Sequence, residues 1–88
     1  MEKKTAPLDQ FPAGTRGIVR HMNGGSNLVS RMASHGLAIG SEVLVRQNYD
    51  HGPLIVVVRD TRVALGRGQA SRVLVEGLGN GWKPADEQ

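Results

Sequence analysis

The sequence predicts a mainly β protein with one small domain. Valine occurs ten times and is the commonest branched apolar residue, only three residues are aromatic, and twelve glycines separate the apolar segments. Valine favours strands because its branched side chain packs well on a pleated surface, and glycine favours the turns that join strands. A chain of 88 residues has room for one domain only. We therefore expect short strands joined by tight turns.

The first strand and the main helix are expected in the first half of the chain. Residues 17–21 (GIVRH) have the composition of a short strand that ends in a glycine-rich turn. The apolar residues that follow change to helical spacing, which predicts a helix at about 26–35. Ser26 or Asn27 is expected to cap its first turn.

The end of this helix and the next strand are marked by glycine. Gly36 stands where a left-handed residue ends a helix, and Leu37 after it is expected to fold back onto the helix as an apolar contact. A second turn at 39–41 leads into residues 42–48, in which Val43 and Val45 occupy alternate positions. This alternation predicts a half-buried strand.

The second half of the chain predicts a hairpin and a closing strand. Residues 54–59 (LIVVVR) are apolar on both faces, so we expect this strand to be central. A short turn at 59–62, where aspartate tolerates the left-handed conformation, joins it to a strand that ends at Leu65. A helical turn near 68–71 and a last strand at 73–75 complete five strands.

Five short strands with polar turns close most economically into a small barrel, because closure removes exposed strand edges. An SH3-like barrel fits this set of elements best. We expect the barrel to span residues 8–76, between a flexible N-terminus (1–7) and a flexible C-terminal tail (77–88). Trp82 is expected to pin this tail locally.

Composition excludes several classes of protein. The chain has no cysteine, so neither disulfides nor a thiolate metal site can stabilise it. The longest apolar run covers residues 53–58, far short of the roughly 20 residues that cross a bilayer. No apolar block follows the charged start, so nothing resembles an export signal. We expect a soluble cytoplasmic protein that is not inserted in the membrane.

The basic charge suggests nucleic acid as an alternative partner. The net charge is +3, but the eight arginines are spread along the chain instead of forming one patch. Single-strand binders also use stacked aromatic side chains, whereas Phe11 and Tyr49 lie in separate connections. Nucleic acid is therefore an unlikely partner, and an SH3-like nucleic-acid-binding or generic adaptor module is kept as the alternative function.

Neither catalysis nor a native metal site is expected. His21, His35 and His51 are too far apart in the chain to match a metal-ligand motif, although His51 beside Asp50 could collect an adventitious transition metal. The serines lie at caps or on exposed helix positions without a base, and no carboxylates form a pair. The sequence thus predicts no enzyme and no cofactor.

Several motifs together resemble the FeoA family of small cytoplasmic proteins. They are 12–15 (PAGT), 31–40 (RMASHGLAIG), 63–70 (VALGRGQA) and the closing strand 73–75. The resemblance covers roughly residues 7–76 and implies an SH3-like fold. Ile39 and Gly68 depart from the family pattern, which often has proline and a helix former there. No DNA-binding helix pair precedes these motifs, which favours FeoA over the related barrel of metal-dependent repressors.

The resemblance implies an accessory or regulatory protein of ferrous iron uptake that docks on the cytoplasmic part of the FeoB-type transporter. Transition metal ion binding is a function associated with this role, and a homodimer formed through a strand edge is compatible with it. We expect the partner-binding surface to be a cleft between the helix and the connection across from it. Its residues would be Arg31, Met32, Leu37, Pro53 and Leu54. Met32, Leu37 and Pro53 are expected to be exposed there, whereas Leu54 also fits the core.

Overall fold

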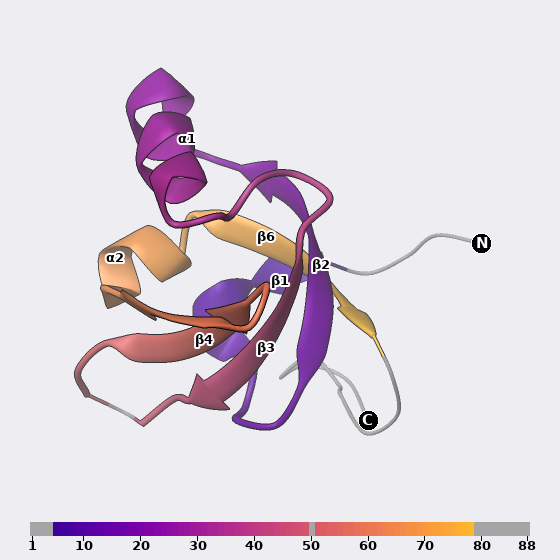
Figure 1. Ribbon diagram of the computed structural model, residues 1–88. Coiled ribbons are helices and arrows are strands. Elements are labelled where there is room, and N and C mark those ends of the chain that lie inside the picture. The colour runs from indigo at the N-terminus through magenta and orange to yellow at the C-terminus, as the bar shows by residue number, and fades with distance from the viewer. Residues whose placement is uncertain (1–4, 50, 79–88) are drawn as a thin grey trace.

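The computed structural model describes residues 5–49 and 51–78 (Figure 1). Six strands, two α-helices and one short 3-10 helix follow one another along these residues. In chain order they are β1 (Thr5–Pro7), η1 (Leu8–Gln10), β2 (Arg16–Met22), α1 (Gly25–Ser34), β3 (Glu42–Gln47), β4 (Leu54–Val58), β5 (Thr61–Leu65), α2 (Arg67–Ala70) and β6 (Val73–Leu78).

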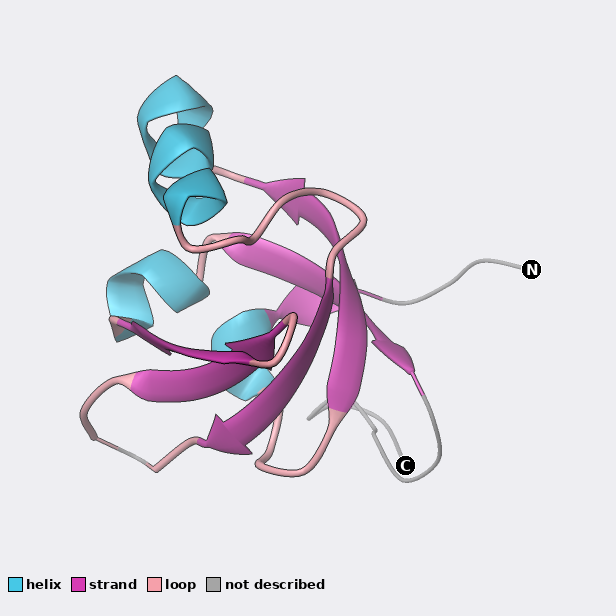
Figure 2. Cartoon of the chain, in the orientation of Figure 1, coloured by secondary structure: helices cyan, strands magenta, loops and turns pink. Residues whose placement is uncertain are grey.

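The six strands form one antiparallel sheet in the order β1-β6-β2-β3-β4-β5. The sheet curves strongly around the core, with α1 at one end (Figure 2). The mainly β class is confirmed. The prediction that the barrel closes is wrong, because β1 and β5 form no ladder with each other within the described residues. Two strand edges therefore stay open.

The core fills the concave side of this sheet. It consists mostly of valine and leucine, as the composition indicates, with one aromatic residue, Phe11, which is fully buried. Alternate residues of β4 are buried and half-buried, so one face of this strand packs into the core. We expected β4 to be central, but it lies one strand from the edge, between β3 and β5.

Strand β1 and helix η1 were not predicted. Thr5–Pro7 lie in the segment expected to be flexible, yet they pair with Leu74–Glu76 of β6, and Ala6 is buried. In the structure these residues form an edge strand that covers β6. Strand β6 also continues through Gly77 and Leu78, which pair with β2. The rest of the predicted tail, including Trp82, lies outside the described residues.

Helix α1 begins and ends one residue before the predicted bounds of about 26–35. The cap prediction is wrong: the N-cap residue is Gly24, and no side chain caps the helix. At the other end, Gly36 has φ +88°. The Leu37 N–H donates to the Met32 carbonyl at 2.9 Å, and the Gly36 N–H donates to the Ala33 carbonyl at 2.9 Å. These two bonds form a Schellman motif, which turns Leu37 into the core.

The β4–β5 hairpin turns through two residues, both left-handed. Arg59 has φ 52° and Asp60 has φ 64°. Val58 pairs with Thr61 and closes the turn, which is the geometry of a type I′ hairpin. The predicted turn is confirmed, and it fixes the register of every residue along the two strands.

Candidate docking surface

The predicted partner-binding residues divide into buried and exposed groups. Met32, Leu37 and Leu54 are all 0% exposed, so the prediction that Met32 and Leu37 are exposed is wrong. The Schellman motif buries Leu37, and Met32 lies on the face of α1 that meets the core. Arg31 and Pro53 are exposed, as expected.

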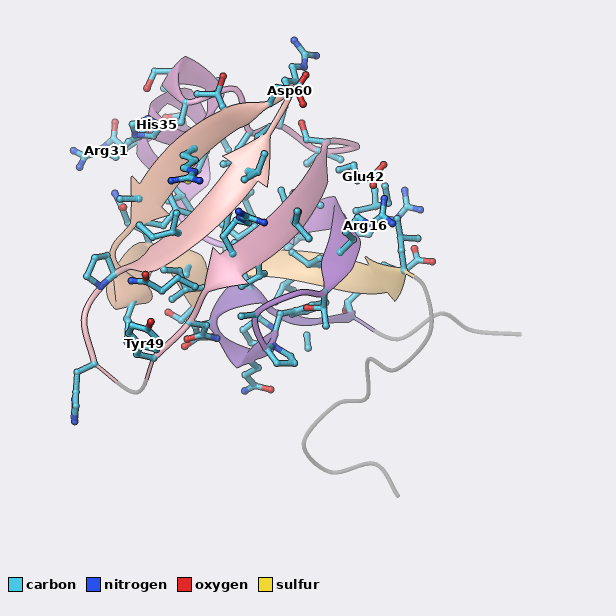
Figure 3. The ribbon with its side chains drawn as sticks, turned by 60° about the horizontal axis from the view of Figure 1, so that its bottom comes forward. Arg16, Arg31, His35, Glu42, Tyr49 and Asp60 are labelled. Carbon is cyan, nitrogen blue, oxygen red and sulfur yellow. The ribbon has the colours of Figure 1, made fainter. Side chains whose placement is uncertain are left out.

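The two exposed residues do not share a cleft. Arg31 belongs to α1, whereas Pro53 belongs to the β3–β4 connection, and these two segments lie at different ends of the molecule (Figures 1 and 3). The predicted cleft between them is therefore wrong. The prediction failed because the β3–β4 hairpin carries its connection away from α1, to the far end of the sheet.

A different groove lies where the chain leaves α1 and enters β3. We call it the Ile39 groove; it has a volume of about 660 Å³ and runs from the 38–41 turn across β3 to the tip of the β4–β5 hairpin. Ile39 is 62% exposed, which is unusual for a large apolar side chain in this fold. Leu44 and Val57 line the same groove and are half-buried.

Backbone bonds hold Ile39 out of the core. The Gly40 N–H donates to the Val19 carbonyl at 2.7 Å, and Gly40 has φ +96°. The Ser41 hydroxyl accepts from the Ala38 N–H at 3.0 Å. The turn is thus fixed on both sides of Ile39, so its exposure follows from the backbone. An isoleucine inside a glycine-containing turn is the sequence signal that points to this residue.

Charged residues border the Ile39 groove. Arg16 and Glu42 lie 3.5 Å apart at one side, where both side chains are more than half exposed. Arg59 and Asp60 lie at the hairpin tip on the other side. Figure 3 shows Arg16, Glu42 and Asp60 around this part of the molecule. An apolar centre with a charged rim is the usual anatomy of a protein–protein interface.

A second groove follows the outer edge of β5, and we call it the β5 groove. It has a volume of about 590 Å³. One wall is Ser34 at the end of α1 with His35 and Gly36 after it. The other wall is formed by hairpin residues other than Asp60: Val58, Arg59 and residues 61–64. No local pattern in the sequence marks this edge, because an open edge depends on which strands pair across the sheet.

The described residues hold no cluster of side chains of the kind that binds a metal ion. No group of three or more histidine, cysteine, aspartate or glutamate side chains comes together in them. None of the helices in this part of the chain is long and apolar enough to cross a membrane.

Comparison with known proteins points to one family. The model of the FeoA domain matches residues 6–77. A protein of Methanocaldococcus jannaschii named "Putative Fe(2+) transport protein A" is 34% identical over 70 residues, which cover 80% of this chain and 84% of that protein. The match therefore spans most of both chains.

Solved structures agree with this match. The crystal structure of an iron uptake regulatory protein (FeoA) superposes with a TM-score of 0.82 at 36% identity, covering 85% of this chain and all of that one. FeoA of Stenotrophomonas maltophilia complexed with zinc, described as a prokaryotic SH3 domain protein, has a TM-score of 0.67 at 28% identity over 78% and 87% of the two chains. A manganese-dependent transcriptional repressor shares the fold at 21% identity, and the match covers 44% of its chain.

Proposed function

Because this chain belongs to the FeoA family, we propose that it is an accessory protein of ferrous iron transport that docks on the cytoplasmic part of a FeoB-type transporter. The observation that carries the accessory role is the match to Fe(2+) transport protein A over most of both chains. We infer that the protein is cytoplasmic and regulates or assembles its partner without catalysis of its own.

The Ile39 groove supports docking on a protein partner. Ile39 is exposed at its centre, and arginine and acidic side chains lie at its rim. Burying an exposed isoleucine on association is favourable, and rim charges add specificity. We propose that Ile39 is the apolar anchor of the transporter interface. Of the residues that the sequence suggested, Arg31 and Pro53 stay available at the surface for further contacts.

A nucleic-acid-binding module is the second candidate, favoured by the net charge of +3. The described aromatic residues support it poorly, because Phe11 is buried in the core and Tyr49 stands alone at 68% exposure. Binding to nucleic acid would weaken steeply with salt, whereas docking on a protein through an apolar anchor would depend on salt only modestly.

The test is a titration of the purified chain against the cytoplasmic domain of a FeoB-type transporter from the same organism, with a random oligonucleotide as the control. We expect saturable binding to the transporter domain alone. Ile39→Glu should weaken it at least about tenfold, since it puts a charge into the apolar centre of the interface.

Tyr49→Glu is the matched control, because Tyr49 is equally exposed but lies outside the Ile39 groove. It should bind like the wild type, and both variants should keep the wild-type thermal transition. Binding to the oligonucleotide alone would overturn the accessory role. Equal losses in the two variants would remove Ile39 as the anchor.

A further inference from the structure

Strand β5 is an open edge with free backbone hydrogen-bonding groups. Among the described residues it pairs with β4 alone, at the end of the sheet. Because Val58 and Thr61 close a two-residue turn, the alternate residues Arg62 and Ala64 direct their N–H and C=O groups away from β4. Both residues are exposed, and these groups make no hydrogen bond within the described residues.

The opposite edge of the sheet is much less suited to pairing. Strand β1 has only three residues, Thr5–Pro7, and its last residue is a proline without an N–H group. Strand β5 has five residues and no proline. An incoming strand would therefore find its backbone partners at β5.

Both faces beside this edge are basic. The β5 groove on the α1 side contains Arg59 and Arg62 and no carboxylate. On the other face, Arg46, Arg62 and Ile55 line a depression of about 450 Å³, again without a carboxylate. Arg31 in the last turn of α1 and His35 just after this helix lie beside the β4–β5 hairpin (Figure 3), and His35 lines the β5 groove. This charge favours an acidic ligand.

We propose that the β5 edge binds an extended acidic segment of a partner protein, which joins the sheet as an additional strand. Alternate side chains of such a segment point to opposite faces. Apolar ones would enter the β5 groove over Val63, and acidic ones would meet Arg46 and Arg62 on the other face. The identity of the protein that supplies the segment rests on the proposed function; the binding mode does not.

A second copy of this chain is a poorer occupant of the same edge. Antiparallel pairing of two β5 edges centred on Arg62 would place the Arg62 side chains of both copies directly opposite each other, and like charges on adjacent strands are destabilising. An acidic strand instead places opposite charges there. The edge is thus selective for a ligand of complementary charge.

The test uses a synthetic peptide of about six residues with alternating glutamate and valine, matching the length of a typical strand. We expect it to bind the full chain and to slow hydrogen exchange of the Arg62 and Ala64 amides, measured by NMR. The same peptide with alternate N-methyl groups is the ligand control. It keeps the charge but cannot complete the backbone ladder, so it should not protect these amides.

Two variants separate backbone pairing from charge. Ala64→Pro removes one outward N–H, which an edge strand tolerates, and should weaken peptide binding about fivefold to tenfold. Arg62→Glu should weaken it at least about tenfold. Arg72→Glu is the matched charge control, because exposed Arg72 lines neither face of β5. It should change affinity less than twofold.

The outcomes are decisive. Equal binding of the N-methylated and unmodified peptides, or equal losses in Arg62→Glu and Arg72→Glu, would overturn strand addition in favour of general charge attraction. Preference for an oligonucleotide, or dimers without peptide, would overturn the acidic-segment ligand. If the peptide binds as expected but the transporter domain does not, the binding mode stands and the proposed function fails.

Discussion

Gly17 shows how closely two strands approach one another in this protein. A Cβ atom at this position would lie 2.2 Å from Cγ1 of Val75 and 2.8 Å from the backbone oxygen of Glu76. Any side chain here would push β2 away from β6. These two strands are neighbours in the interior of the sheet. Gly68 is the opposite case, since a Cβ there would meet nothing within 4 Å.

We expect Gly17→Ala to lower the free energy of unfolding by about 2 kcal/mol, because the methyl group overpacks the contact between β2 and β6. Gly68→Ala should raise it by about 0.5–1 kcal/mol, because glycine inside α2 costs conformational entropy that alanine does not. Chemical denaturation of the two variants measures both changes. If Gly17→Ala raised the free energy of unfolding as Gly68→Ala does, the close approach of the two strands would not be the reason for glycine at position 17.

At the scale of elements, Asn48 joins three segments at the end of β3. Its Nδ2 donates to the backbone oxygens of Asp9 and Phe11 at 2.9 and 2.7 Å, and its Oδ1 accepts from Arg67 Nη2 at 2.7 Å. These bonds connect η1 and α2 to β3. At the same corner, Asp9 Oδ1 and Arg67 Nε are buried without a hydrogen-bond partner among the described residues.

Asn48→Asp keeps the size of the side chain but replaces its donor with an oxygen. We expect it to lower the free energy of unfolding by about 2–3 kcal/mol, because two carbonyl oxygens then lose their donor and face a carboxylate oxygen. Asn27→Asp, on the exposed side of α1, is the control and should change stability by at most about 0.5 kcal/mol. Equal effects in thermal denaturation would show that Asn48 is not a structural link.

Within the described residues the molecule is an open sheet, and its two edge strands, β1 and β5, differ in length. Strand β1 covers β6, and Ala6 is buried as part of the core. Strand β5 has no such cover on its outer side. In the part of the chain that the structure describes, β5 is thus the longer of the two edge strands, and the hairpin tip that leads into it also borders the Ile39 groove.

Deleting residues 1–7 tests the role of β1 for the whole sheet. We expect the truncated chain to lose about 2 kcal/mol of stability, because the ladder to β6 and the burial of Ala6 both disappear. It should also self-associate more readily, since β6 then has an open edge. Thermal denaturation and analytical ultracentrifugation measure the two effects. Unchanged behaviour would mean that this segment is flexible in solution.

Local sequence patterns determined most of the elements. The spacing of apolar residues located α1, Gly36 and Leu37 marked its end, and valine-rich segments located β2 to β6. Such signals are local, because helical periodicity, a left-handed glycine and strand alternation depend on neighbouring residues. The FeoA motifs likewise follow from order and spacing along the chain.

Only the tertiary structure decided which surfaces are exposed. Hydropathy could not show that Met32 and Leu37 are buried while Ile39 is exposed, because burial depends on where the backbone carries each side chain. Pairing between residues far apart in the chain made Thr5–Pro7 a strand and left β5 as an open edge. The sequence by itself therefore determined the elements and the family. Long-range contacts decided the edges, and with them the surfaces available to a partner.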